Sequence, residues 1–143
     1  MKRFIISFLS LCGALSMQAQ TDTTTFKGRI ENAEYNVFID MDFYHKNIIV
    51  PRQEVFGEMP GYFGDRKDSR CWFIVDADVK GKTAQLSISN DYGSEDLTAT
   101  LTLNADGTYI LEQIDGSMLK IARNRKWVKM PKKLVFDKAK MEK

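Results

Sequence analysis

The chain has 143 residues, of which 43% are hydrophobic and 28% charged, with a formal net charge of +2. This length supports one domain with a single core, and no segment has the composition of a long linker or a low-complexity tract. A single histidine excludes a multi-histidine metal site, and two cysteines exclude a disulfide-rich scaffold.

The first predicted element is a cleaved signal peptide over residues 1–20. Lys2 and Arg3 form its basic start, a short apolar run follows, and small and polar residues precede a cleavage site after Ala19 or Gln20. The apolar run is shorter than the about 20 residues that a membrane-spanning helix requires. We therefore expect the protein to be exported to the periplasm, the cell surface or the medium.

Removal of the signal peptide leaves residues 21–143 as a single domain with Cys71 as its only cysteine, so no internal disulfide can form. Beside two aromatic residues, this thiol is expected to be a small buried hydrophobe. Residues 21–119 hold nine Lys and Arg against seventeen Asp and Glu, whereas residues 120–143 hold ten against two. The basic C-terminal stretch could be an interaction tail or a strand that lies across an acidic barrel.

Alternation of apolar and polar residues with a period of two predicts antiparallel strands throughout this domain. In Leu97–Leu103, every threonine falls on the polar face, and the odd-numbered residues of 73–79 are expected to share one apolar face. Asp-Gly pairs at residues 106–107 and 115–116 predict tight turns. Strands are expected near residues 24–31, 34–43, 47–52, 70–79, 83–90, 96–104, 107–114 and 117–128, with further pairing around 133–137.

About eight consecutive antiparallel strands joined mostly by short turns predict an all-β fold. We expect a single up-and-down β-barrel or a barrel-like meander, because closure removes exposed strand edges. A barrel of about eight strands is either filled by its own side chains or holds one small ligand.

The least strand-like segment comprises residues 54–65, which contain three glycines, one proline and three aromatic residues. Its glycine spacing is not that of a phosphate-binding loop. One interpretation is a lid over the barrel mouth or a contact patch for a partner. The preferred interpretation is that Phe56, Tyr62 and Phe63 turn inward and plug one end of the barrel.

A second notable segment, Arg123–Lys129, combines cations with Trp127, which suits phosphate groups or sugars. In an exported protein we expect no nucleic-acid partner, and anionic glycans or lipid head groups fit better. The preferred interpretation is a basic strand that buries Trp127 in the core and leaves its lysines in water.

No motif in the chain predicts catalysis. Residues 90–96 gather oxygen ligands in a turn, but without the spacing of a calcium loop. His45 falls in a predicted hairpin connection and has no evident nucleophile to activate. Carboxylate pairs such as Asp40 and Asp42 could act as in glycosidases only if a cleft brought two together. We therefore expect no catalytic residue, no metal and no cofactor.

Three segments, Phe56–Gly64, Asn90–Thr98 and Lys126–Lys132, resemble small exported proteins of Bacteroidetes-type bacteria, and the Gln-Ala-Gln end of the signal peptide is similar to theirs. The resemblance extends over nearly all of the mature chain and implies no activity. By analogy of architecture, it implies a lipocalin-like or avidin-like barrel. The binding residues of lipocalins and avidins do not map onto this chain, because neither signature stretch is present.

These observations predict a non-catalytic binding or interaction module of unknown ligand. Its partner would be a small apolar ligand, a glycan or an envelope protein, and peripheral contact with a membrane is compatible with the sequence. No oligomeric state is indicated. The residues expected to make contact are Phe56, Met59, Tyr62, Phe63, Arg125 and Trp127.

Two alternatives stay open, and they differ in the structure they require. A carbohydrate-active hydrolase would bring two carboxylates together at the barrel mouth, at least one with a perturbed pKa. A structural accessory subunit of an envelope complex would have a filled barrel and a contiguous exposed apolar patch. A binding barrel would instead present an open apolar cavity or groove near Tyr62 and Trp127.

Overall fold

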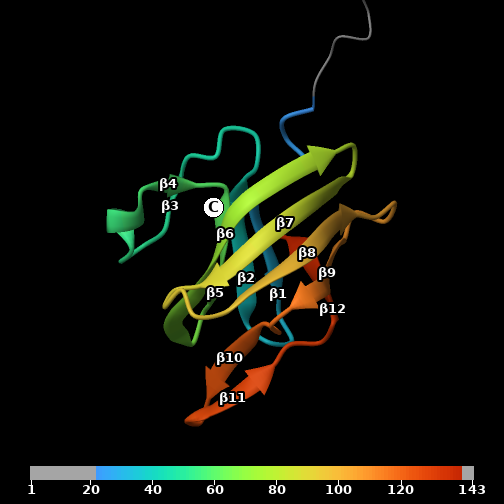
Figure 1. Ribbon diagram of the computed structural model, residues 1–143. Helices are drawn as coiled ribbons and strands as arrows, with labels where there is room; N and C mark the ends of the chain where they lie inside the picture. Colours follow the sequence, from blue (N-terminus) through green and yellow to red (C-terminus); the bar gives the residue numbers. More distant parts are fainter. Residues whose placement is uncertain (1–21, 140–143) are drawn as a thin grey trace, which may run out of the picture.

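Eight antiparallel strands follow one another around a closed barrel in the computed structural model, which describes residues 22–139 (Figure 1). Pairing of the last barrel strand with the first closes the barrel. This confirms the predicted all-β, up-and-down β-barrel. The signal peptide predicted over residues 1–20 lies outside the described residues. The barrel strands are β1 (Lys27–Asn32), β2 (Val37–Asp42), β5 (Gly61–Asp65), β6 (Asp68–Lys80), β7 (Thr83–Asn90), β8 (Asp96–Leu103), β9 (Tyr109–Gly116) and β12 (Lys133–Lys138).

Strand β8 shows how the apolar alternation builds the barrel wall. Leu97, Ala99 and Leu101 are buried inside the barrel, while the threonines between them face outward. Successive side chains of a strand point to opposite faces, so the period-two pattern assigns every second residue to the core. The predicted orientation of this strand is confirmed.

Strand β6 departs from a single alternation because it contains a β-bulge between Ile74 and Asp76. Trp72 and Ile74 point into the barrel before the bulge, whereas Ala77 does so after it. An extra residue in one strand reverses which positions face inward. The expectation that the odd-numbered residues of 73–79 share one face is therefore wrong, and Val75 is exposed.

The barrel interior is filled by one continuous apolar cluster. The ring of Phe26, the residue before β1, stacks on Phe43 with centroids 5.6 Å apart and meets Tyr109 edge-on at 6.1 Å. Close packing of this kind is the usual state of a protein interior. The fully buried side chains include Phe63, Phe136, Ile30, Ile39, Ile74, Ile88, Leu101 and Leu111.

Two excursions interrupt the meander of barrel strands. Between β2 and β5, a flap carries β3 (Ile48–Ile49), the short 3-10 helix η3 (Glu54–Phe56) and β4 (Glu58–Met59). Between β9 and β12, a hairpin is formed by β10 (Lys120–Arg123) and β11 (Lys126–Lys129). The single strands expected near 47–52 and 117–128 are therefore wrong: only two residues of the first are extended, and the second folds into this hairpin.

The flap covers the outer wall of the barrel and not its mouth. Its residues Val50 and Met59 pack on outward-facing side chains of the wall in a second apolar cluster that includes Phe38, Tyr62 and Phe73. This cover explains why β6 is buried on both faces from Cys71 to Ile74. The interpretation of residues 54–65 as a lid over the barrel mouth is therefore wrong. The interpretation as a plug is wrong as well, since Phe63 is the only one of the three aromatic residues in this segment that lies inside the barrel.

Strand β5 lies within residues 54–65, the segment whose composition is least typical of a strand. Its glycines allow residues of β2 to approach the β5 backbone closely. A Cβ on Gly61 would lie 2.4 Å from the carbonyl oxygen of Asp40, and one on Gly64 would lie 2.4 Å from the ring of Phe38. Glycine inside a strand often marks such a contact. The same residues that suggested a loop therefore permit β5 to pair with β2.

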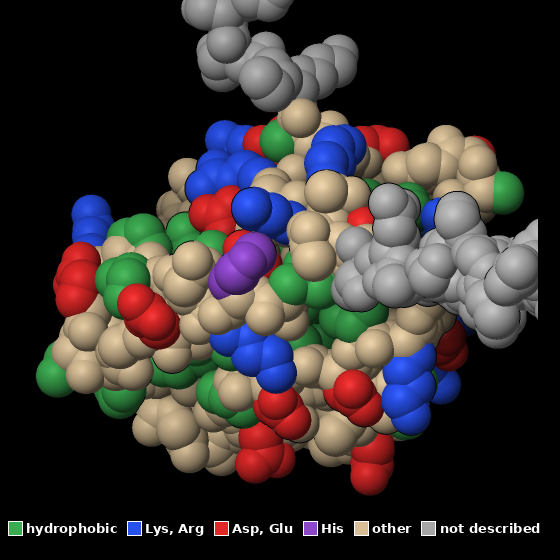
Figure 2. All heavy atoms as spheres, turned by 90° about the horizontal axis from the view of Figure 1, so that it is seen from above, with side chains coloured by type: hydrophobic (Ala, Val, Ile, Leu, Met, Phe, Trp, Pro, Cys, Tyr) green, Lys and Arg blue, Asp and Glu red, His purple; other side chains and the backbone are tan. Residues whose placement is uncertain are grey.

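The upper end of the barrel presents charges of both signs (Figure 2). His45, the purple side chain there, accompanies Asp42 in a turn at this end, with 3.0 Å between its Nδ1 and the carboxylate. Hydrophobic side chains reach the surface at the left of this view, on the side where the flap projects in Figure 1. This end therefore has no single-sign field that would select a charged partner.

Candidate ligand-binding site

The hairpin of β10 and β11 projects from the lower end of the barrel in Figure 1, and its base packs against the barrel core. Leu119, Ile121 and Met130, at and near its base, are buried in the barrel core. A hairpin alone is marginally stable in water, so these apolar contacts are needed to hold it. Side chains at the base of the hairpin thus cover part of the lower end of the barrel.

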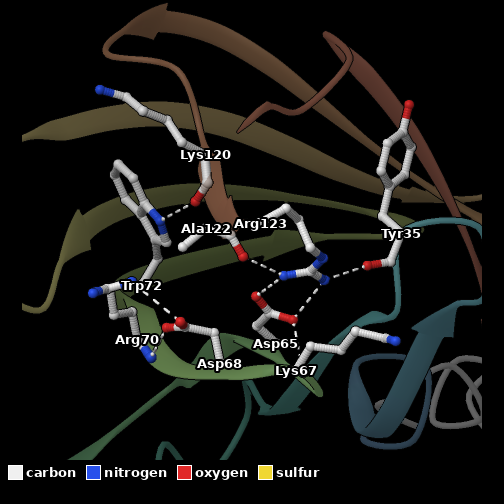
Figure 3. Close-up of polar contacts among 9 residues, drawn as sticks. All are labelled: Tyr35, Asp65, Lys67, Asp68, Arg70, Trp72, Lys120, Ala122 and Arg123. Carbon is white, nitrogen blue, oxygen red and sulfur yellow. Dashed lines mark hydrogen bonds and ion pairs between the residues drawn. The ribbon is translucent and has the colours of Figure 1, made fainter. Parts of the chain in front are cut away.

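An ion pair fastens this hairpin to the barrel rim (Figure 3). The Arg123 guanidinium donates to both carboxylate oxygens of Asp65, at 2.6 and 2.8 Å, and to the carbonyl oxygens of Ala122 at 2.7 Å and Tyr35 at 2.9 Å. The hydrogen bond to Asp65 raises the pKa of Arg123 above its ordinary value. Because the Asp65 side chain is only 4% exposed, this pair is a structural clamp and is not open to a ligand.

Two further contacts bind β10 to the barrel. Lys120 pairs with Glu95, with 2.9 Å between Nζ and Oε1. The carbonyl oxygen of Lys120 accepts a hydrogen bond from Trp72 Nε1 at 3.2 Å, as Figure 3 shows. Both cations of β10 therefore neutralise carboxylates of the acidic barrel. The expected charge complementarity between the basic stretch and the barrel is present for this strand.

A pocket of about 120 Å³ lies between the hairpin and the ends of β6 and β7, and we call it the mouth pocket. Phe63, Trp72 and Ile121 contribute its apolar lining. Two aromatic side chains, Tyr92 and Trp127, line it as well and are 70% and 58% exposed. A concave site with exposed aromatics and a few polar groups is the usual form of a small-ligand site.

Arg70 lies beside the two exposed aromatic residues of the mouth pocket. Its guanidinium carbon lies 5.3 Å from the ring centroid of Trp127, within the range of a cation–π contact. The neighbouring Tyr92 side chain raises the pKa of Arg70, and the charge of Asp68 adds to this effect. Arg70 thus lies near both rings at the rim of the pocket.

The hairpin turn carries an arginine where the backbone favours glycine. Asn124 and Arg125 both have positive φ, 54° and 65°, in the two-residue turn between β10 and β11. Turns of this type favour Asn-Gly, since a side chain at the second position costs about 1 kcal/mol. Arg125 is exposed beside Trp127, and the two line a shallow depression together with Arg70.

The structure divides the six predicted contact residues among three places. Arg125 and Trp127 lie on the hairpin, and Phe63 lies under the mouth pocket. The others are on the outer wall: Phe56 is exposed on the flap, Met59 is buried on the inner side of the flap, and Tyr62 is buried beneath it. The preferred interpretation that Trp127 is a core residue is wrong.

Sequence reasoning missed Arg70 and Tyr92 at the rim and the Asp65–Arg123 clamp. Tyr92 falls in the turn of residues 90–96, where its ring is 70% exposed. Among residues 22–139, no three His, Cys, Asp or Glu side chains are grouped to hold a metal ion. In the same residues, no helix has the length and apolar character needed to cross a bilayer.

The carboxylates considered for catalysis have structural partners. Asp40 accepts hydrogen bonds from Arg29 at 2.7 Å and from Tyr62 at 3.0 Å. Burial would raise the pKa of Asp42, but hydrogen bonds from His45 and Tyr44 outweigh it and lower that pKa. Both carboxylates are therefore engaged in holding the wall and a turn.

Cys71 is expected to resist alkylation in the native protein. Its side chain lies in the cluster beneath the flap, and burial, with a smaller effect of Asp91, raises the pKa of the thiol to about 12. Thiolate is the reactive form, so at pH 8.5 iodoacetamide should react about a thousandfold more slowly than with the unfolded chain. In a Cys12→Ser variant, where Cys71 is the sole thiol, reaction at the unfolded rate would contradict this burial.

The fold and the site define a class: a closed eight-stranded up-and-down barrel with a filled interior and a small aromatic pocket at one end. Comparison of the chain with protein-family models, curated proteins and solved structures gave no match.

Proposed function

We propose that the protein is an exported, non-catalytic binding module that contacts its ligand or partner at the mouth pocket and its rim. The rim consists of Arg70, Tyr92, Arg125 and Trp127. One continuous apolar cluster occupies the barrel interior, so recognition is expected at the end of the barrel. The volume of the pocket suits a single ring or side chain, with the exposed aromatics as its walls.

The observation that carries this proposal is the Arg125 backbone. A residue held in a sparsely populated conformation is often retained for function. Arg125 and Lys126 have no ion pair within residues 22–139, in contrast to Lys120 and Arg123 of the same hairpin. The hairpin thus uses the cations of β10 for attachment and offers those of its turn, beside Trp127, to a ligand.

Arg125→Gly is expected to separate stability from binding. Glycine removes the strain of the positive φ, which stabilises the fold, but it also increases the entropy of the unfolded chain, which opposes this gain. The free energy of unfolding should therefore rise by about 0.5 kcal/mol. The same variant should bind more weakly, because it loses the cation beside Trp127. Thermal denaturation measures the first effect, and titration with the ligands found on an array of neutral and acidic oligosaccharides measures the second.

Trp127→Ala is the companion variant. It should weaken ligand binding by about 2 kcal/mol, the usual cost of truncating an aromatic residue at the centre of a contact. Its fold should persist because Trp127 is not a core residue. Ligand binding that survives both substitutions unchanged would contradict a site at the rim.

A second candidate, an accessory subunit of an envelope complex, is favoured by one feature of the flap. Ile49, Val55 and Phe56 are 45%, 88% and 56% exposed on this short segment. Exposed apolar side chains gathered in one region often mark a protein contact. The filled barrel agrees with this candidate as well as with the first.

A further inference from the structure

The outer wall of the barrel carries a groove that continues from the mouth pocket. It has a volume of about 450 Å³ and runs between the flap and the turn that joins β5 to β6. Phe38, Tyr62 and Cys71 contribute to its lining. Asp65, Arg70 and Cys71 line both the groove and the mouth pocket, so the two hollows adjoin.

The charge of this groove is predominantly positive. Its exposed cations are Arg52, Arg66, Lys67 and Arg70. The two carboxylates that also line it are neutralised within the fold: Asp65 is held by Arg123, and Asp68 pairs with Arg70 at 3.1 Å.

Two of the four cations have no ion-pair partner. Arg66 contacts the Glu31 carboxylate, whereas Arg52 and Lys67 make no ion pair within residues 22–139. Arg52 also has a positive φ of 69°, a conformation that costs a residue with a side chain about 1 kcal/mol. Unpaired cations on both sides of one groove create a positive potential that favours an anionic ligand.

The surroundings of the groove favour recognition by side chains over pairing with a peptide backbone. The strand beneath it, β5, is paired with β2 on one side and β6 on the other. An extended peptide bound by strand addition needs an unpaired edge, which β5 does not offer. Guanidinium groups, in contrast, suit carboxylate and sulfate groups.

We propose that the groove and the mouth pocket together bind an acidic polysaccharide. One sugar ring lies between Tyr92 and Trp127, and the carboxylate or sulfate groups of neighbouring sugars lie along Arg52, Lys67 and Arg70. This inference rests on the proposed binding function and assigns its ligand class. The pocket is the size of about one ring, and the adjoining groove extends the site along the outer wall.

Isothermal titration of the full chain with oligogalacturonate tests this inference, and the methyl-esterified oligomer is the matched ligand without charge. We expect the acidic oligomer to bind and the ester to bind at least tenfold more weakly. Arg52→Glu/Lys67→Glu should weaken binding of the acidic oligomer by a further tenfold or more. Lys80→Glu/Lys82→Glu makes the same charge change at the β6–β7 turn, at the opposite end of the barrel, and should leave binding unchanged.

The outcomes separate this inference from the proposed function. Equal binding of the ester, or of poly-glutamate, would overturn the acidic polysaccharide as ligand class, and an unchanged groove variant would overturn the groove. If Trp127→Ala still abolished binding of the ester or of a neutral oligosaccharide, the rim would remain the site. Absence of binding by oligogalacturonate and by every ligand of the array would overturn both.

Discussion

Replacing Arg123 by methionine is expected to lower the free energy of unfolding by about 3 kcal/mol. The substitution leaves the Asp65 carboxylate, 4% exposed, without its cation and removes two hydrogen bonds to it. Breaking a buried ion pair on one side costs about 3–5 kcal/mol, and the 23% exposure of Arg123 places the effect at the lower end. Urea denaturation of the full chain measures the change.

The double variant Asp65→Asn/Arg123→Met is the control for this result. It removes both charges, so it should recover much of the lost stability. Arg123→Lys should fall between the wild type and Arg123→Met, since an ammonium group cannot make the bidentate contact. A change below about 1 kcal/mol in Arg123→Met would contradict the role of this pair as the clamp of the hairpin.

Gly61→Ala is expected to destabilise the barrel by about 3 kcal/mol, an unusually large effect for one added methyl group. The new Cβ would lie 2.4 Å from the Asp40 carbonyl oxygen and 3.0 Å from the Met41 Cα, both in the backbone of β2. Backbone atoms cannot move aside as a side chain does, so the pairing of β2 with β5 must open. Thermal denaturation followed by circular dichroism measures the loss.

Gly81→Ala is the matched control, because a Cβ there meets no atom within 4 Å. Its positive φ of 64° makes the substitution cost about 1 kcal/mol through backbone strain alone. Equal losses in the two variants would contradict the close approach of Gly61 to the backbone of β2 as the cause of the effect.

The barrel was predictable because seven of its strands repeat a simple alternation or follow tight turns. The eighth, β5, was missed because Gly61 and Gly64 suggest a loop unless the neighbouring strand is known. The phase of β6 was missed at its bulge for a similar reason, since the extra residue is defined only by the pairing with β7.

The site was predictable only in part, and the reason lies in long-range contacts. Trp127 and Arg125 were selected from local composition, which is visible in the sequence. Their partner Arg70 is more than fifty positions away, and only closure of the barrel brings it over the indole ring. The pairing of Asp65 with Arg123 spans a similar distance, so no local pattern distinguishes this aspartate from its neighbours.

Strands β1 and β12, the first and last of the described chain, pair side by side, and the last residues of β12 lie at the barrel end opposite the hairpin. Ala139 donates a hydrogen bond from its backbone N–H to the carbonyl oxygen of Arg29, and the Lys138 ammonium donates one to the carbonyl oxygen of Lys27. Figure 1 shows the β10–β11 hairpin projecting from the other end. An attachment that leads directly from either end of residues 22–139 would therefore lie at the opposite end of the barrel from the aromatic rim.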